Sequence, residues 1–557
     1  MKIDIKQISS LEKVRVNDNL DQREIYTRKV LAGERVSYQL SMKSVDAQCF
    51  VKVSLETALA NNVKLYVVKD AYMDTPVTEI VEKEDYITLE PGFMPDILIP
   101  LEETNNCLFM RTGINTIWVK VDIPKNITPG IYPVKIKLIF KIPNGEDILT
   151  INKMMMIEVI SAVMPEQKLI YTRWLYLDCI AMSHNVEIFS QAHWNLIEEY
   201  ISAASDVGIN MILVPIHTPP LDTEIGAKRQ CVQLVDIEKK GEEYVFSFER
   251  FNRFIDICKR NGIQYFEMAH LFSQWGAKYA PNIMVTVNGR KEYLFGWNVA
   301  ADSPKYRFFL MQYIPAISNE LKRKGISKKT YFHISDEPTF KNIDTYKKAS
   351  ELIRPLIGDC KIVDALSDYI FYEQGLMECP VTNIKHINDF LEKRIENQWL
   401  YYCCVPQKVF PNSFMAMQSY RIRILGFLLY RYDIKGFLHW GFNFYNSSLS
   451  VYPINPYLTT SGDGSFPSGD PFIVYPAKNG VYTSIRGEIT YEAIQDMNIC
   501  YALENRIGRE NVVQMIDDAA GQKIRFDAYP KSSEFLEELR TKMIERIEII
   551  DRMNHEN

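Results

Sequence analysis

Two adjacent carboxylates, Asp336 and Glu337, end an apolar, aromatic-rich run and are followed at once by Pro338. The run before them, Lys329-Thr-Tyr-Phe-His-Ile-Ser335, is typical of a buried strand. Because successive side chains of a strand point to opposite faces, neighbouring acids share a cleft only at a bend or a strand end. Pro338 supplies such an end, since proline cannot continue a strand ladder and restricts the residue before it. The pair therefore indicates acid/base chemistry at the mouth of a buried strand.

A carboxyl group in an apolar, aromatic pocket has its charged form disfavoured, which raises its pKa toward the range useful to a general acid. A second carboxylate close by acts in the same direction. The structural alternative is a capping role, in which the acids open a helix predicted over 343–357. A position at the end of a barrel strand favours the catalytic interpretation, so the next question is whether the chain contains a barrel.

Strand and helix patterns alternate from Leu169 onward, and eight segments have the composition of buried strands. They are Thr172–Asp178, Met211–Ile216, Tyr265–His270, Tyr331–Asp336, Lys361–Leu366, Val381–Ile384, Gln398–Cys403 and Gly436–Phe442. Helical patterns lie between them, several ending at glycine, over 194–207, 251–260, 305–324, 343–357, 386–395 and 417–433. This alternation predicts a (β/α)8 TIM-like barrel. The weakest strand is Val381–Ile384, so an incomplete barrel stays open, whereas an open doubly wound sheet lacks its Gly-x-Gly-x-x-Gly fingerprint.

Residues 1–165 show period-2 alternation and turn signals without a convincing long helix, which predicts an N-terminal β-sandwich domain. A hairpin is expected over 233–248, within the barrel domain of residues 166–510. Residues 511–557 are expected to form a C-terminal helical extension, in which a charged amphipathic helix over 532–552 packs on the barrel's exterior. The fold class is therefore multidomain, β followed by α/β.

The active site of such a barrel lies at the C-terminal ends of its strands, and polar and aromatic side chains recur there. Their repeated occurrence at several strand ends indicates a binding site, whereas any one of these residues alone would be weak evidence. Besides Asp336 and Glu337, the candidates for substrate contact are His217, His270, Trp275, Tyr401, Trp440 and Asn443. Tryptophan and tyrosine faces stack on sugar rings, although packing under loops is about equally common.

A metal centre and a covalent Ser or Cys nucleophile are not expected. The chain has eight histidines, without a His-x-His at the first strand or a His-Glu-x-x-His, so no metal or other cofactor is predicted. His333 is interpreted as a buried, hydrogen-bonded core residue. No Gly-x-Ser-x-Gly elbow occurs, and the adjacent Cys403 and Cys404 lack an obvious base.

The overall composition excludes several classes of partner. A net charge of -6 with interspersed signs argues against nucleic acid as a partner, and no apolar run is long enough to span a bilayer. The first residues, Met-Lys-Ile-Asp-Ile-Lys-Gln, lack an apolar signal-peptide core, so a cytoplasmic location is expected, while a secreted mature form stays open. The 32 Tyr, 28 Phe and 7 Trp suit a glycan substrate as well as aromatic-rich packing. The oligomeric state is left open.

Three motifs in order resemble glycoside hydrolase family 123. They are Ile334-Ser-Asp336-Glu337-Pro338, then Gly436-Phe-Leu-His-Trp440-Gly-Phe-Asn443-Phe-Tyr445, then Gly462-Asp-Gly464 leading to Tyr475-Pro476 and Ser484-Ile-Arg486-Gly-Glu488. The resemblance covers most of residues 170–505 and includes a β-sandwich before the barrel. The chain departs from the family pattern where Ser465–Val474 intervenes before Tyr-Pro, and at Tyr482-Thr-Ser in the closing motif. These departures bear on the leaving-group side and the exact sugar more than on the chemistry.

The resemblance implies a retaining β-N-acetylgalactosaminidase in which the 2-acetamido oxygen of the substrate is the nucleophile. Such an enzyme needs no second carboxylate across the cleft, which explains how its two acids can be adjacent. By the motif of the family, Glu337 would protonate the leaving oxygen, and Asp336 would accept the acetamide N–H. Trp440 and Asn443 would contact the sugar.

Three alternatives stay open from the sequence. The first is a two-carboxylate glycosidase with Glu337 as acid and Glu267 or Asp364 as nucleophile. The second is a non-catalytic carbohydrate-binding barrel. The third is a metal-dependent barrel hydrolase using strand-end histidines.

Overall fold

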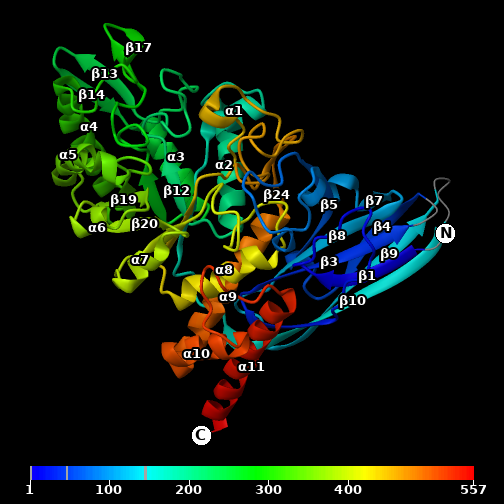
Figure 1. Ribbon diagram of the computed structural model, residues 1–557. Helices are drawn as coiled ribbons and strands as arrows, with labels where there is room; N and C mark the ends of the chain where they lie inside the picture. The colour runs from blue at the N-terminus through cyan, green and yellow to red at the C-terminus, as the bar shows by residue number, and fades with distance from the viewer. Residues whose placement is uncertain (1–2, 45–47, 143–146, 557) are drawn as a thin grey trace. The chain divides into compact units, whose positions relative to one another are not determined.

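The structure, a computed structural model, describes residues 3–44, 48–142 and 147–556 (Figure 1). Its contacts separate two compact units. The first contains residues 1–168, 408–431 and 482–557, and the second contains residues 169–407 and 432–481. The first unit therefore gathers segments from both ends of the chain. The domain boundaries predicted after residues 165 and 510 stay a prediction.

The N-terminal part of the first unit is β-rich and holds two sheets. One includes strands in the order β1-β3-β8-β5-β6, which are β1 (Ile3–Ser9), β3 (Arg35–Ser44), β8 (Gly113–Asp122), β5 (Val63–Met73) and β6 (Gly92–Pro100). The other has the order β2-β10-β9-β4-β7, which are β2 (Thr27–Ala32), β10 (Asp147–Val163), β9 (Gly130–Lys141), β4 (Cys49–Glu56) and β7 (Cys107–Met110). Alternate residues of both sheets, such as Tyr38 and Leu40 of β3 and Ile136 and Leu138 of β9, belong to one buried cluster. The period-2 pattern in the sequence reflects this core.

Four helices complete the first unit: α8 (Tyr420–Arg431), α9 (Ile485–Ile507), α10 (Arg509–Ala520) and α11 (Ser533–Glu556). α11 packs on α9, α8 and β10 of its own unit, and the prediction that it packs on the barrel's exterior stays a prediction. A buried ionic cluster joins these helices, in which Arg423 of α8 bonds to Asp496 of α9 at 2.7 Å and to Glu537 of α11 at 3.1 Å. These charges need one another once they leave water.

The closing motif that contributed to the family resemblance lies at the start of α9, within the same unit. Arg486 is fully buried and pairs with Asp96 at 2.9 Å. Glu488 is also buried and bonds to Lys120 at 3.2 Å. Both side chains are therefore engaged in ion pairs inside the first unit.

The second unit contains a closed barrel of eight parallel strands. In barrel order these are β11 (Ile170–Arg173), β12 (Met211–Val214), β15 (Tyr265–Met268), β18 (Thr330–Phe332), β19 (Lys361–Leu366), β20 (Cys379–Asn383), β21 (Trp399–Tyr401) and β22 (Gly436–His439). β22 pairs with β11 and closes the barrel. The weakest predicted strand is present as β20, so the incomplete barrel is excluded. Burial on both faces explains why these strands have nearly continuous apolar sequences.

Helices stand between most consecutive barrel strands, as the alternating pattern predicted (Figure 1). They are α1 (Leu177–Ser183), α2 (Gln191–Asp206), α3 (Glu249–Arg260), α4 (Pro304–Arg323), α5 (Ile343–Ile353), α6 (Ile370–Glu373) and α7 (Ile387–Glu392). The helix between β21 and β22 is α8, which belongs to the first unit.

Six barrel strands are shorter than predicted, and two of these, β11 and β18, bear on the residues that follow them. β11 ends at Arg173, and α1 begins at Leu177, inside the segment expected to be a strand. β18 ends at Phe332. Two residues later, the backbone N–H of Ile334 donates to the buried carboxylate of Asp364 at 3.1 Å and not to a backbone carbonyl of a neighbouring strand. A side chain here takes the hydrogen bond that a strand ladder would have used. Asp336 and Glu337 therefore follow the strand in an irregular segment.

A four-stranded sheet is inserted in the second unit, with the order β14-β13-β16-β17. The predicted hairpin is confirmed as β13 (Asp236–Lys240) and β14 (Glu243–Ser247). The second hairpin, β16 (Ile283–Val287) and β17 (Arg290–Phe295), was not anticipated. Among the described residues, no helix has the length and apolar character needed to cross a membrane.

The packing between β21 and β22 predicts a specific sensitivity. A Cβ added to Gly436 would lie 2.0 Å from the buried indole ring of Trp399, so Gly436→Ala must displace a barrel side chain. We expect a loss of roughly 1–3 kcal/mol in the free energy of unfolding and a lower melting temperature, measured by circular dichroism. Gly92→Ala is the matched control, since a Cβ there has nothing within 4 Å. Equal melting temperatures for the two variants would contradict this packing.

Candidate active site

A cavity with an empty volume of about 690 Å³ opens among the segments that follow the barrel strands. Its wall is formed by Trp174, Tyr176, Leu221, Asp222, Gln274, Trp275, Asp336, Glu337, Ala365, Tyr401, Cys403, Cys404, Leu438, Trp440 and Phe466. These residues lie at or after the C-terminal ends of β11, β12, β15, β18, β19, β21 and β22. The cavity therefore occupies the face at which barrel enzymes carry their chemistry.

Asp336 and Glu337 both line this cavity, and an unusual backbone turn makes this possible. Glu337 has a φ of +45°, a left-handed conformation that is strained for a residue other than glycine. Its N–H donates to the carbonyl of Ala365 at 3.1 Å, and the carbonyl of Asp336 accepts from the N–H of Trp275 at 2.9 Å. The bend that the sequence required before Pro338 is thus located at Glu337 and held from two neighbouring strand ends.

The side chains of the pair have different surroundings. The hydroxyl group of Tyr401 donates to Oε1 of Glu337 at 2.6 Å, which fixes the direction of that carboxyl group. Asp336 is half-buried, and the loss of water contact together with the charge of Glu337 raises the pKa of Asp336 well above its ordinary value.

Trp440 forms part of the cavity wall and is held in place by the long segment after β22. Its indole Nε1 donates to Oδ2 of Asp470 at 2.9 Å. The ring centroid lies 5.0 Å from those of Phe444 and Phe466. Asp470 also lies 3.2 Å from Nε2 of His439, measured to Oδ1. The aromatic face of Trp440 is therefore positioned before any substrate binds.

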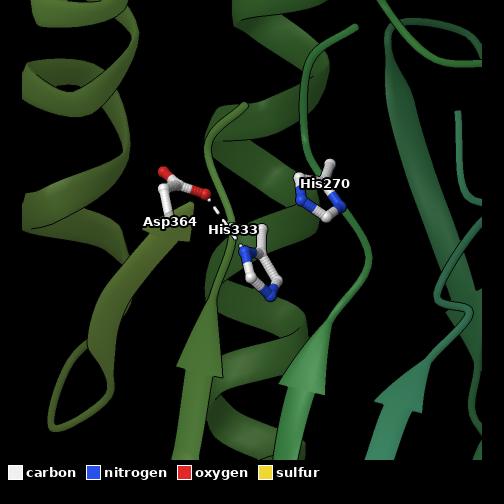
Figure 2. A group of neighbouring side chains, drawn as sticks. All are labelled: His270, His333 and Asp364. Carbon is white, nitrogen blue, oxygen red and sulfur yellow. Dashed lines mark hydrogen bonds and ion pairs between the residues drawn. The ribbon is translucent and has the colours of Figure 1, made fainter. Parts of the chain in front are cut away.

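A buried ionic group includes His333 and Asp364, which come from neighbouring strands and are joined by a hydrogen bond (Figure 2). His333 hydrogen-bonds through Nδ1 to Asp364 at 3.1 Å and through Nε2 to Glu267 at 2.8 Å. Burial acts to lower the pKa of His333, but the hydrogen bonds and charges of Asp364 and Glu267 outweigh it and raise the pKa to about 9. His333 is therefore an imidazolium ion clamped between two carboxylates.

The ring of His270 stacks on that of His333, with centroids 4.1 Å apart and planes 18° from parallel. His270, His333 and Asp364 lie close enough to suggest a metal site, since one potential ligand atom from each falls within 4.8 Å of the others. The donor chemistry does not fit, because both ring nitrogens of His333 carry protons directed at carboxylates and offer no lone pair to a metal. His333 and Asp364 belong instead to a structural ion group with Glu267, and His270 stacks on it as a neutral ring.

Glu267 and Asp364 were the sequence candidates for a second catalytic carboxylate. Both are fully buried, and neither is part of the cavity wall described above. Glu267 additionally accepts from Nε1 of Trp174 at 3.2 Å, and Asp364 accepts from the hydroxyl group of Tyr346. Their positions suit the support of the cavity floor and not attack on a substrate.

The structure brings three of the six predicted contact residues to the cavity: Trp275, Tyr401 and Trp440. It does not bring His217, His270 or Asn443 there. His217 is buried and bonds through Nε2 to the carbonyl of His270 at 2.8 Å. The amide of Asn443 is occupied by the backbone of Tyr176, whose N–H and carbonyl it bonds at 2.8 and 3.1 Å. These residues do lie near the strand ends, as predicted from the sequence. The sequence could not show whether each side chain is directed into the cavity or into the protein.

Several wall residues were missed, namely Trp174, Tyr176, Asp222, Cys403 and Cys404. Trp174 and Tyr176 were hidden by the overlong first strand, since a strand ending at Arg173 would have placed both at its exit. Asp222 is a third carboxyl group on the wall, and burial raises its pKa to about 6. It lies in a loop after β12, where the spacing carried no signal.

The ion group predicts a pH-dependent stability. We expect His333→Gln to lower the free energy of unfolding by about 3–5 kcal/mol, because two buried carboxylates lose their cation. The pKa of His333 is raised from 6.5 to about 9, so its contribution is complete below pH 6.5 and is lost as the pH rises through 9. In urea unfolding, the difference between wild type and variant should therefore shrink over this interval. A difference that is constant or grows with pH would contradict a charged His333.

We compared the sequence and the fold of this chain with those of known proteins. The sequence model of the glycoside hydrolase 123 catalytic domain matches residues 174–503. A family 123 glycoside hydrolase from Clostridium perfringens, whose structural analysis concerned glycolipid glycan hydrolysis, superposes with a TM-score of 0.74 at 17% identity, covering 100% of this chain and 99% of that one. At that identity the likeness shows the fold alone.

Other similarities are weaker. A β-glucuronidase from Bifidobacterium dentium has a TM-score of 0.33 at 10% identity, covering 89% of this chain and 66% of its own, too low to support an argument. The search of curated proteins found no match. The match to the family 123 catalytic-domain model extends over more than half of the chain and includes every wall residue of the cavity. The chain belongs to glycoside hydrolase family 123 and is a glycosidase.

Proposed function

We propose that this glycosidase is a retaining exo-β-N-acetylgalactosaminidase that uses the 2-acetamido group of its substrate as the nucleophile. The observation that carries the proposal is the adjacency of Asp336 and Glu337 on one cavity wall. A conventional retaining glycosidase needs two carboxyl groups about 5–5.5 Å apart on opposite sides of the scissile bond. Neighbouring residues on one wall cannot flank a sugar in that way, but they can serve a substrate that supplies its own nucleophile.

The two acids then have separate roles. Glu337, directed by the hydroxyl group of Tyr401, protonates the leaving oxygen and later deprotonates the attacking water. Asp336 accepts the acetamide N–H, which turns the acetamide oxygen toward the anomeric carbon and stabilises the oxazolinium ion that forms. In the free site, burial and the charge of Glu337 raise the pKa of Asp336. An N–H donated to Asp336 by the substrate favours the ionised form of that carboxyl group.

The aromatic wall supports a sugar-binding role. Trp174 and Trp440 line the cavity, and each indole N–H is bonded to a carboxylate, so both rings are fixed on a wall where an aromatic side chain can contact a sugar. Trp275 also lines the cavity but is 49% exposed, so it suits a contact at the entrance. The same cavity wall, at the ends of parallel strands separated by helices, is the reason to propose that the barrel is of the (β/α)8 TIM type.

Asp222 defines the remaining alternative within enzymes. It lies on the cavity wall and is a carboxyl group that could act as a direct nucleophile in a two-carboxylate mechanism. Its Oδ2 accepts from the N–H of Leu449 at 3.0 Å, which suits a residue that orients sugar hydroxyl groups. The two mechanisms differ in their response to an oxazoline mimic.

An inhibitor separates these mechanisms. N-acetylgalactosamine-thiazoline imitates the cyclic intermediate, so under substrate assistance it should inhibit competitively and bind at least about 100-fold more tightly than N-acetylgalactosamine. Hydrolysis of an aryl β-N-acetylgalactosaminide provides the assay, and the matching aryl β-galactoside, which lacks the acetamide, should not be turned over. An active enzyme that ignores the thiazoline, or that forms a covalent glycosyl ester on Asp222, would refute the proposal.

Substitution of the two acids should have different kinetic signatures. Asp336→Asn should lower kcat by about 10²–10⁴ for every leaving group, because orientation of the nucleophile is lost. Glu337→Gln should do so chiefly for poor leaving groups, since a reactive aryl oxygen needs little protonation. The kcat values of both variants on an aryl series are the measurement, with circular dichroism to establish folding. Identical dependence on the leaving group in the two variants would contradict the assigned roles.

A further inference from the structure

Two adjacent thiols, those of Cys403 and Cys404, lie on the wall of the same cavity as the catalytic acids. They follow β21 directly, and Tyr401 at the end of that strand bonds to Glu337. Both thiols are reduced and partly exposed, and their sulfur atoms are 3.9 Å apart. The proposed reaction uses neither of them. Adjacent thiols of this kind could form a disulfide or bind a thiophilic metal ion.

Geometry favours the metal ion. Unstrained disulfides join residues whose Cα atoms are about 4.4–6.8 Å apart, whereas consecutive Cα atoms are only about 3.8 Å apart. A tetrahedral ion with two metal–sulfur bonds of about 2.3 Å holds its sulfur atoms about 3.8 Å from each other. The observed separation of 3.9 Å matches this spacing without rearrangement of the side chains.

The charge around the thiols also suits a cation. The hydrogen bond from Cys404, burial and the negative charges of Glu337 and Asp470 raise the pKa of the Cys403 thiol, and a bound cation would offset those negative charges. Two thiolates are donors that zinc and its heavier relatives prefer. Both cysteines belong to the cavity wall, and Sγ of Cys403 also contacts the carbonyl oxygen of Val405 at 3.7 Å.

We propose that Cys403 and Cys404 form an inhibitory site for a thiophilic divalent cation such as Zn²⁺ or Cd²⁺. The ion is bound by both sulfur atoms after their protons are released to solvent, and its remaining coordination positions face the cavity. Occupation places a positive charge beside Glu337 and fills part of the space that the sugar needs. The ion is an inhibitor here and takes no part in the reaction.

Cadmium is the probe, because its thiolate complexes absorb in the ultraviolet. The reduced full-length protein should bind one Cd²⁺ at this site with a sulfur-to-metal charge-transfer band. Cys403→Ser and Cys404→Ser should each remove the band and weaken binding by about tenfold or more, since loss of even an outer-shell partner of a metal costs that much. Cys231→Ser changes another partly exposed thiol of the same unit and should bind as the wild type does.

Two further measurements keep the proposal testable if a variant fails to fold. In wild-type protein, Cd²⁺ should protect Cys403 and Cys404, but not Cys231, from alkylation, as read by peptide mass spectrometry. Cd²⁺ should also inhibit hydrolysis of the aryl substrate, with recovery on addition of a chelator, and each serine variant should resist inhibition relative to its own uninhibited rate.

Three outcomes would refute the proposed metal site. The first is that Cd²⁺ does not slow the alkylation of Cys403 and Cys404, and the second is that both serine variants keep the charge-transfer band. The third is that Cd²⁺ binds tightly but leaves the rate of hydrolysis unchanged. Cadmium binding and protection from alkylation are both measured without turnover. A protein that hydrolyses no N-acetylhexosaminide would therefore refute the proposed function, while these two measurements would still establish or refute the metal site.

Discussion

The active end of the barrel depends on one buried ion group, in which the imidazolium of His333 lies between Glu267 and Asp364. These residues come from three neighbouring strand ends, so the group ties β15, β18 and β19 together where the barrel opens. Removal of His333 would leave the two buried carboxylates without their shared cation. The ion group therefore fixes the floor of the cavity on the side of Asp336, Glu337 and Trp174.

Asp364 and Glu267 each connect the ion group to residues of the cavity wall or to the segment beside it. Through Asp364 it takes the N–H of Ile334 and ends the β18 ladder, which frees the segment that carries Asp336 and Glu337 to turn. Through Glu267 it bonds to the indole of Trp174 on the cavity wall. The strained backbone of Glu337 is thus maintained by its surroundings, as is usual for functional residues with unfavourable dihedral angles. The acid pair Asp336 and Glu337 and the wall residue Trp174 are therefore both connected to this ion group.

The other side of the cavity is organised by Asp470, which comes from the long segment after β22. It bonds to the indole of Trp440 and lies beside His439. Phe466 from the same segment packs on Trp440 and lines the cavity. The segment that follows Gly462-Asp-Gly464 thus brings Asp470 back to the end of β22. Preorganisation by buried carboxylates is therefore common to both sides of the site.

The sequence by itself determined the number and order of the barrel strands, most of the helices, and the position of the acid pair, because these follow from local periodicity and from proline and glycine signals. Motif order was sufficient to identify the family. Only the tertiary structure decided the rest. It showed that His217 and Asn443 are directed into the protein's own hydrogen bonds, that Glu267 and Asp364 neutralise His333, and that α8 and α11 belong to the first unit. These outcomes depend on which charges meet after the chain has folded, and the pairing of charges from distant segments leaves no local pattern in the sequence.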